Sequence, residues 1–400
     1  MKEGWTYKKL GDLFPIVMGK TPPRNISKYW DEKKETNNLW VSIADISKYE
    51  GKEIHETKEY ISDEGKQNIK LIPKGSLLVS FKLTLGKMAF AGENLYTNEA
   101  IMSIQMREDI ELMFLYYYFS YLDWNEIASG NEKVKGKTLN KKSLSEIPIA
   151  YIPLSEQRFI VARLNAAFAH IEALKANAEK QLNEARKLFQ AELTECMRPK
   201  EGWEEKRLGE VCDIFGRIGF RGYTTKDLVQ SPLDGAISLS PSNIQDGRMD
   251  YSKLTYISWF KYEESPEIKI FDGDILLVKT GSSYGKSALV QGLPHEATIN
   301  PQSVVLKNCK INNTFFAYQL RTDRVFNEFN HFVSGTAIPT FSQAKLSTVP
   351  IQYPPLESQH RIVSHLDSLS AKVRELEEVE RKTLAECDAL KQAMLREVFE

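Results

Sequence analysis

The sequence has little of what a secreted, zinc-binding or membrane-spanning chain would carry. Its 400 residues include only four cysteines, and none lies in a C-x-x-C pair or beside a histidine at metal-ligand spacing. No zinc site is therefore expected, and so few cysteines fit a reducing cytoplasm. The first residues, MKEGWTYKKL, lack the apolar run of a signal peptide. The most apolar window, 112–124, is shorter than the roughly 20 residues that a bilayer requires, so it predicts a buried aromatic helix.

An excess of charge of either sign is also missing. Lys and Arg number 53 and Asp and Glu number 54, so the formal net charge is −1. A generally basic nucleic-acid binder would be far more positive, so DNA binding would need local basic patches or a partner. The hydrophobic fraction of 42% and the charged fraction of 27% are typical of a soluble globular protein. The length predicts two domains or more.

What the chain does contain is a long internal repeat. Three blocks occur twice in the same order: EGWTYKKLGDL and EGWEEKRLGEV, residues 73–92 and 272–292, and residues 143–164 and 345–366. The first pair begins at Glu3 and Glu201, an offset of 201 − 3 = 198. Between the blocks the two halves have little in common. A shared frame with different insertions is typical of two related modules that read two targets, although a duplication without functional meaning gives the same pattern.

Each repeat ends in a stretch with helical spacing. No Pro or Gly interrupts residues 156–198 or 357–400, which predicts two helices of about 40 residues. The predicted seam follows heptad a and d positions, at Leu164, Ala167, Ile171, Leu174, Ala178, Gln181, Ala185 and Leu188 and at Leu366, Leu369, Val373, Leu376, Glu380, Thr383, Cys387 and Leu390. Its polar members, Gln181, Glu380 and Thr383, weaken the seam but can fix its register. We expect the two helices to pack as an antiparallel coiled coil. Two ordinary amphipathic helices on separate domains are the alternative.

The rest of each half has short β-like runs between Gly, Asn and Pro turns, followed by an aromatic helical segment. The predicted fold class is α+β. Two homologous domains stand in tandem, separated by two long helices packed as an antiparallel coiled coil, and the whole is pseudo-two-fold symmetric.

One stretch, LLVKTGSSYGKSA at 276–288, is close to a nucleotide-phosphate loop. Such a loop needs four residues between its glycines and a helix at its Lys, but only three separate Gly281 from Gly285, and β-like sequence follows. The twin at 77–89, LLVSFKLTLGKMA, lacks the first Gly and the Ser. No ATP site is therefore expected here.

Signs of catalysis are equally scarce. No H-E-x-x-H or G-x-S-x-G motif occurs. KTPPR at 20–24 shares only its two prolines with the Asn/Asp-Pro-Pro-aromatic motif of adenine methyltransferases, and no G-x-G loop is present to hold S-adenosylmethionine. His360 and His365 fall in the second long helix, where a surface or packing role is expected. We therefore expect no catalytic residue, no metal site and no cofactor on this chain.

Two pairs of loops favour contact with DNA. The hairpin loops within 77–89 and 276–288 combine lysines with small hydroxyl side chains, which suits contact with backbone phosphates. The loops beginning at Ser129-Gly130 and Ser334-Gly335 form the second pair, and the first of these is rich in Lys. The predicted DNA-binding residues are Lys82, Thr84, Lys87, Lys135, Lys137, Lys279, Thr280, Ser282, Ser283, Lys286 and Thr336. A solvated turn and a solubilising charge run are the alternatives.

The doubled arrangement resembles the specificity (S) subunit of type I restriction–modification enzymes. The residues that carry the resemblance are IPLSEQRFIVARL and PPLESQHRIVSHL, the GW…LG openers at Trp5 and Trp203, and GDILLVKTG…GK. It covers essentially the whole chain. The second Pro-Leu-x-Glu-Gln is incomplete, because Ser358 stands where the first copy has Glu156.

The resemblance implies target-recognition domains at 1–152 and 200–354 and spacer helices at 153–199 and 355–400. Each domain would read one half of a bipartite DNA target, and the helices would set the spacer, about one DNA turn or ~34 Å. Two methyltransferase (modification) subunits would bring S-adenosylmethionine and methylate adenine N6. Restriction subunits would bring ATP, Mg²⁺ and cleavage, all in a prokaryotic cytoplasm. A self-contained DNA methyltransferase or nuclease, or a coiled-coil adaptor without DNA recognition, are the alternatives.

Overall fold

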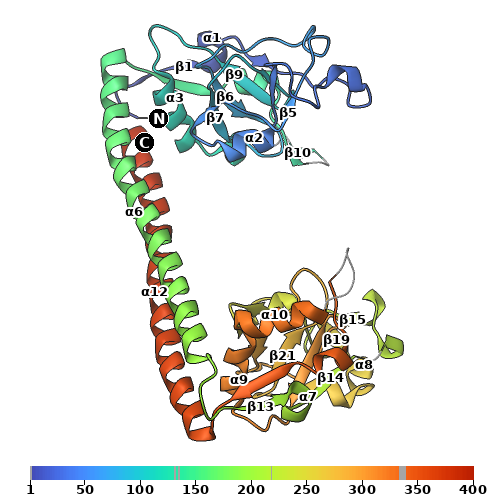
Figure 1. Cartoon of the computed structure of the whole chain (residues 1–400). Helices are drawn as coiled ribbons and strands as arrows, with labels where there is room; N and C mark the ends of the chain where they lie inside the picture. Colours follow the sequence, from blue (N-terminus) through green and yellow to red (C-terminus); the bar gives the residue numbers. More distant parts are fainter. Residues whose placement is uncertain (1, 130–131, 134–135, 218, 333–338) are drawn as a thin grey trace. The chain divides into compact units, whose positions relative to one another are not determined.

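The computed structural model describes residues 2–400 except 130–131, 134–135, 218 and 333–338 (Figure 1). The chain forms two compact units, Met1–Glu179 with Arg381–Glu400, and Lys180–Glu380. The predicted boundaries divide the chain by element type, whereas each compact unit combines one α+β domain with parts of both long helices. Within the described ranges, no helix is long and apolar enough to cross a membrane.

The first unit contains two main sheets besides two two-stranded pairs, β1-β12 and β10-β11. The larger has the order β2-β9-β6-β7-β4 and the smaller the order β5-β3-β8. Their strands are β2 (Val17–Met18), β9 (Ile101–Ile104), β6 (Leu77–Ser80), β7 (Met88–Ala91), β4 (Glu53–Ile54), β5 (Glu59–Tyr60), β3 (Leu39–Val41) and β8 (Tyr96–Thr97). Strand β6 is buried along its whole length, as its unbroken apolar run predicts. The short helices are α1 (Leu10–Leu13), α2 (Ile43–Lys48), α4 (Trp124–Ile127) and α5 (Lys141–Ser145).

The aromatic window forms helix α3 (Leu112–Tyr121), as predicted. Six of its ten residues are buried, and they belong to the same apolar core as β6 and α1. The aromatic side chains of α3 therefore contribute a large part of the buried apolar surface of the first domain.

The second unit repeats this plan with additions. Its two main sheets have the orders β14-β24-β21-β22-β18-β17 and β15-β19-β16-β23-β20. The strands are β14 (Asp213–Gly216), β24 (Ser303–Lys307), β21 (Ile275–Val278), β22 (Ser287–Leu289), β18 (Arg248–Met249), β17 (Ile244–Gln245), β15 (Leu228–Val229), β19 (Tyr256–Ser258), β16 (Gly235–Leu239), β23 (Ala297–Ile299) and β20 (Lys269–Ile270). The helices are α7 (Leu208–Val211), α8 (Trp259–Glu263), α9 (Asn313–Leu320), α10 (Asp323–Phe332) and α11 (Gln343–Leu346).

The opening and closing strands of each domain pair with one another. In the first unit β1 (Thr6–Lys9) is antiparallel to β12 (Pro148–Tyr151), and in the second β13 (Glu204–Arg207) is antiparallel to β25 (Pro350–Tyr353). The registers correspond, with Thr6 opposite Tyr151 and Glu204 opposite Tyr353. The GW…LG opener therefore closes each domain beside the start of its long helix.

The two long helices are α6 (Leu154–Cys196) and α12 (Leu356–Phe399). In the first unit the Nζ of Lys175 lies 2.8 Å from the Oδ1 of Asp388. In the second unit the Nε of Arg186 lies 2.9 Å from the Oε1 of Glu377. In each unit the two helices run antiparallel, which confirms the predicted pairing.

The predicted seam is wrong at four positions. Leu174, Leu188 and Leu390 are 55%, 63% and 50% exposed, and Gln181 is exposed as well. In α6 the inward position next to Leu188 is taken by Phe189, whose ring lies 6.3 Å from that of Tyr318 in the second domain. The helix buries its apolar face against its own domain as well as against α12, so its stripe departs from a strict heptad.

The Gln of the Pro-Leu-x-x-Gln motif attaches each domain to its helix. The Oε1 of buried Gln157 accepts the backbone N–H of Glu111 at 2.9 Å, and its Nε2 donates to the carbonyls of Asp109 and Ile152 at 3.1 and 2.8 Å.

The second copy repeats this anchor. The Oε1 of buried Gln359 accepts the N–H of Asn312 at 2.8 Å, and its Nε2 donates to the carbonyl of Pro354 at 2.8 Å. In both halves a buried amide pairs the start of an aromatic helix with the chain just before a long helix. The motif is therefore explained by a structural role.

Candidate nucleic-acid interface

The near-phosphate-loop of the second unit is a hairpin loop between β21 and β22. The N–H of Gly285 donates to the carbonyl of Val278 at 2.8 Å, and the N–H of Tyr284 donates to the carbonyl of Gly281 at 3.1 Å. Gly281 and Gly285 have φ of +98° and +81°, in the left-handed region that favours glycine. No helix follows Lys286, so the stretch is not a nucleotide-phosphate loop.

A glycine packed against an aromatic ring closes the hairpin in both units. A Cβ on Gly285 would lie 2.6 Å from ring atoms of Phe326, and a Cβ on Gly86 would lie 2.3 Å from the Cδ1 of Trp124. Phe326 comes from α10 and Trp124 from α4, the helical segments that follow α9 and α3. In each domain, the glycine of the Gly-Lys pair therefore contacts an aromatic side chain of a helix, Phe326 of α10 or Trp124 of α4.

The two loops predicted to contact DNA meet one another in each unit. Lys82 forms a β-bridge with Thr138, and Thr280 forms one with Thr340. The Oγ1 atoms of Thr280 and Thr340 are also 2.8 Å apart. Residues about 60 positions apart in the sequence thus form one surface in each domain.

The predicted lysines of the hairpin have different surroundings. Lys286 is exposed, and the ion pairs of the described residues include none to it. Its twin Lys87 pairs with Glu50. Lys82 is partly buried, with its Nζ 5.4 Å from the ring centre of Phe81. Lys286 is therefore the lysine of this set most available to a phosphate.

Lys279 differs from the sequence expectation of a solvent-facing lysine. Lys279 is half-buried and directly follows the last residue of β21. In the first unit the fully buried Phe81 directly follows the last residue of β6, so the two residues occupy equivalent positions. Burial lowers the pKa of Lys279, because it disfavours the charged form of the amine.

The hydroxyl residues of the second loop surround a small hollow of about 180 Å³. Thr280, Ser282 and Ser283 line it together with Gln302, Ser240 and Ser242. Thr84 of the first loop is exposed, and its carbonyl accepts a hydrogen bond from the hydroxyl of Ser80. Hydroxyl and amide groups at this spacing can donate to phosphate oxygens or to base edges.

Three predicted residues fall in segments for which less is described. Lys135 and Thr336 lie outside the described residues. Lys137 lies in β11 (Gly136–Lys137), which pairs with β10 (Glu132–Lys133).

Sequence reasoning missed an aromatic and cationic site in the first unit. The guanidinium of Arg24 lies 4.2 Å from the ring centre of Trp30 and 4.9 Å from that of Trp40, and it also pairs with Glu59. Arg24, Trp30 and Glu59 line a cavity of about 420 Å³. Two tryptophans in a segment without a counterpart in the second half were the available signal.

Three residues that are not at metal-ligand spacing along the sequence lie close together where the long helices pair. Glu192 and Cys196 lie one turn apart on α6, and the Nε2 of His365 lies 2.9 Å from the Oε1 of Glu192. One ligand atom from each falls within 4.8 Å of the others. Burial raises the pKa of the Cys196 thiol to about 11, and its Sγ donates to Glu192 at 3.5 Å. One hydrogen bond between the helices, from His365 to Glu192, and one within α6, from Cys196 to Glu192, account for these contacts.

Comparisons with known proteins agree with the doubled frame. A family model described as the type I restriction modification DNA specificity domain matches residues 2–184 and again 200–386. The chain therefore belongs to this family, and its two tandem DNA specificity domains make it a specificity subunit of a type I restriction–modification system. The resemblance stated from the sequence is confirmed.

Individual relatives share this organisation. The type I restriction enzyme MjaIX specificity subunit of Methanocaldococcus jannaschii is 23% identical over 406 residues, covering 90% of this chain and 86% of that protein. The EcoDI specificity subunit of Escherichia coli is 24% identical over 332 residues, covering 72% and 70%. A solved structure described as the basis of complex assembly and conformational transition of the type I R-M system superposes with a TM-score of 0.73 at 20% identity. It covers 100% of this chain and 98% of that one, and so shows the same fold.

Proposed function

We propose that each domain reads one half of a bipartite DNA target through the surface where its two loops meet. The observation that carries this proposal is the repeated hairpin. In both units a Gly-Lys loop packs on an aromatic helix and forms a β-bridge to the second loop. The neighbouring surfaces differ, with Arg24 over two tryptophans in the first unit and a hydroxyl-lined hollow in the second. A shared frame would hold the backbone, and different side chains would read different bases.

Within each surface the cationic and hydroxyl groups have separate tasks. Lys286, Lys87 and Lys82 contact phosphates, which contributes affinity without sequence preference. The hydroxyls around the hollow of the second unit donate to and accept from base edges or phosphates. Because Lys279 is half-buried, we assign it a weaker phosphate contact than Lys286.

The chain itself performs no covalent step in this proposal. Two modification subunits hold S-adenosylmethionine and methylate adenine N6, and restriction subunits use ATP and Mg²⁺ for translocation and cleavage. The complex works in a prokaryotic cytoplasm. Leu188 of α6 and Leu390 of α12 support two docking sites, because both are exposed and they occupy equivalent positions, 390 − 188 = 202 residues apart. The long helices fix the spacer between the half-sites.

Footprinting of the complete methyltransferase complex on its DNA tests the split-site proposal. Two protected patches separated by a weakly protected spacer are expected, with one methylated adenine mapped near each patch. One continuous footprint, or no footprint with the modification subunits present, would contradict it. The matched control is the complex of modification subunits without this chain, which should protect no specific sequence.

A further inference from the structure

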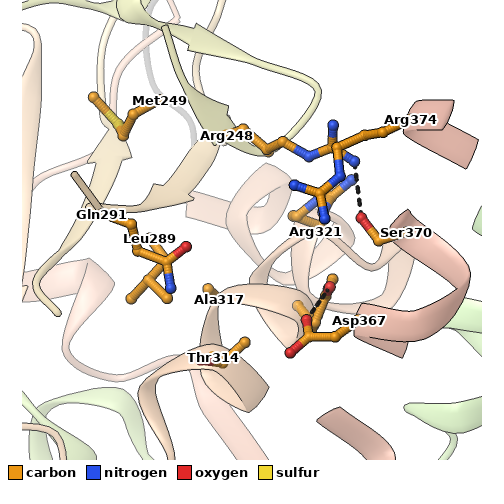
Figure 2. A pocket seen from close by; sticks show the side chains of 12 residues that line it. Arg248, Met249, Leu289, Gln291, Thr314, Ala317, Arg321, Asp367, Ser370 and Arg374 are labelled. Carbon is orange, nitrogen blue, oxygen red and sulfur yellow. Dashed lines mark hydrogen bonds between the residues drawn. The ribbon is translucent and has the colours of Figure 1, made fainter. Parts of the chain in front are cut away.

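The second unit contains a cavity of about 420 Å³ beside α12 that the proposed DNA surface does not use. Three arginines from separate elements reach it (Figure 2). Arg248 comes from β18, Arg321 directly follows α9, and Arg374 comes from α12. The rest of the lining is mixed, with Met249, Leu289 and Ala317 beside the polar side chains of Gln291 and Thr314. A cavity of this size is within the range of small-molecule sites.

The arginines have few counter-charges, although burial lowers the pKa of Arg248 and the carboxylates of Glu377 and Asp246 act in the opposite direction. The ion pairs found among the described residues include none to Arg248, Arg321 or Arg374. Arg248 donates to the hydroxyl of Ser370 at 2.8 Å, as the dashed line in Figure 2 marks. Arg321 lies over two aromatic rings, with its Cζ 5.5 Å from the ring centre of Phe189.

The carboxylate that lines the cavity is already engaged. Asp367 accepts a hydrogen bond from the hydroxyl of Tyr318 at 2.7 Å. Burial lowers the pKa of both Arg248 and Arg321, and the charge of Arg374 lowers that of Arg248 further. Like charges gathered in a partly desolvated site cost free energy unless an anion joins them.

The first unit fills the corresponding space. Phe168 stands 370 − 168 = 202 positions before Ser370, and its ring packs 5.3 Å from that of Tyr117. Glu172 occupies the position of Arg374 and pairs with Lys391. Glu53 takes the place of Arg248. Glu53 pairs with Phe90 in the first unit, and Arg248 pairs with Leu289 at the equivalent position of the second. The shared frame therefore does not require the cavity or its charges, which belong to the second unit.

We propose that this cavity binds a phosphate group through the guanidiniums of Arg248, Arg321 and Arg374. Guanidinium donors match the geometry of phosphate oxygens, and one phosphate would neutralise most of the charge excess. The cavity of about 420 Å³ leaves room for an organic portion beyond the phosphate, beside Leu289, Gln291 and Thr314. A free phosphate ester and the DNA backbone both offer this group. The inference does not depend on the loops at 279–286 contacting DNA.

The test uses the full chain and two variants that act by different means. Arg321→Gln removes one charge, and Ser370→Phe copies the first unit by filling the cavity without removing a charge. Lys372→Gln is the matched control, because it removes an exposed charge of α12 that does not line the cavity. A denaturation profile for each variant identifies any that fails to fold, and the other variant then carries the test.

Two binding arms separate the sources of the phosphate. In the first, inorganic phosphate, pyrophosphate and ADP are titrated at constant ionic strength and binding is measured by calorimetry. In the second, affinity for a non-specific duplex is measured over a range of salt concentrations. If the ligand is a free phosphate ester, the variants should weaken binding in the first arm by about tenfold or more, because a charged contact is lost. If the ligand is the DNA backbone, the same loss should appear in the second arm. In the second arm the salt slope should also fall by about one.

Wild-type and Lys372→Gln chains should bind in the arm where the two cavity variants lose affinity. The proposal is overturned if Arg321→Gln and Ser370→Phe match the wild type in both arms. It is also overturned if they impair only assembly with the modification subunits, since the cavity would then receive acidic side chains of a partner. The footprint of the two half-sites is a separate measurement, so failure of one proposal leaves the other intact.

Discussion

The two units of this chain agree in how their domains are anchored to the long helices and differ at the surfaces proposed to bind DNA and phosphate. Gln157 and Gln359 accept the backbone N–H at the start of corresponding aromatic helices, and Leu10 and Leu208 are both fully buried. The Arg24 site belongs to the first unit, and the three-arginine cavity belongs to the second. The duplicated core contacts give both domains the same fold. The inserted segments can therefore differ in sequence and in chemistry without loss of that fold.

The largest expected effect comes from breaking the shared anchor. Gln157→Ala would leave one buried N–H and two carbonyls without their partner, which should lower the free energy of unfolding by about 3–5 kcal/mol. Gln359→Ala removes two such contacts and should cost less. Denaturant unfolding of the full chain, with hydrogen exchange at Glu111 and Asn312, measures both.

The exposed Gln181 on α6 gives the matched control, since Gln181→Ala should change stability little. Equal effects of all three substitutions would show that the buried amides do not hold the domains to their helices.

The sequence predicted this frame because repetition and periodicity are local patterns. The apolar runs became β6 and β21, and the Pro- and Gly-free stretches became α6 and α12. The role of the motif glutamines could not be predicted, because the N–H partner of Gln157 lies 46 residues away.

The candidate sites were predicted less completely for the same reason. The hairpin lysines were found from a local pattern, but the burial of Lys279 depends on the surrounding domain. Arg248, Arg321 and Arg374 come from three elements, and His365 meets Glu192 only where two helices pair. Contacts between residues so far apart in the sequence cannot be predicted from residue spacing.

A second prediction tests whether the hairpin glycines are needed for packing or only for backbone shape. Gly285→Ala should destabilise the second unit by about 2–3 kcal/mol, because φ is +81° and the new Cβ would meet the ring of Phe326. Gly202→Ala has a similar φ of +85° with no atom within 4 Å, so it should cost only about 1 kcal/mol.

Thermal unfolding compares these two variants, and Gly86→Ala should resemble Gly285→Ala because its Cβ would meet Trp124. If Gly202→Ala and Gly285→Ala are equally destabilising, the contact with the aromatic ring adds nothing beyond backbone strain.

A third prediction compares the twin lysines. Lys286→Ala should weaken binding about fivefold on every DNA sequence and reduce the salt slope by about one. Lys87→Ala should act in the same direction but less, because Lys87 already pairs with Glu50. Binding of the methyltransferase complex to specific and non-specific duplexes over a salt range measures both. The exposed Lys253 supplies the control, Lys253→Ala. A change in sequence preference would mean that the loop reads bases.

The smallest expected effect concerns the lysine that replaces a buried phenylalanine. Burial lowers the pKa of Lys279 in the folded chain below its ordinary value of 10.5, so between these two values the unfolded chain binds more protons. Stability relative to Lys279→Met should therefore rise with pH through that interval and level off above 10.5, where the amine is neutral in both states. Partial exposure keeps the effect small, since solvent screens the charge.

Thermal unfolding of the full chain at a series of pH values from about 8 to 10.5 follows this difference. Lys286→Met is the matched control, because it makes the same change at an exposed lysine of the same loop. Parallel curves for the wild type and Lys279→Met would mean that the Lys279 amine reaches solvent as freely as that of Lys286. The replacement of Phe81 by Lys279 would then be a surface difference between the two domains, and Lys279 would be as available to a DNA phosphate as its neighbour.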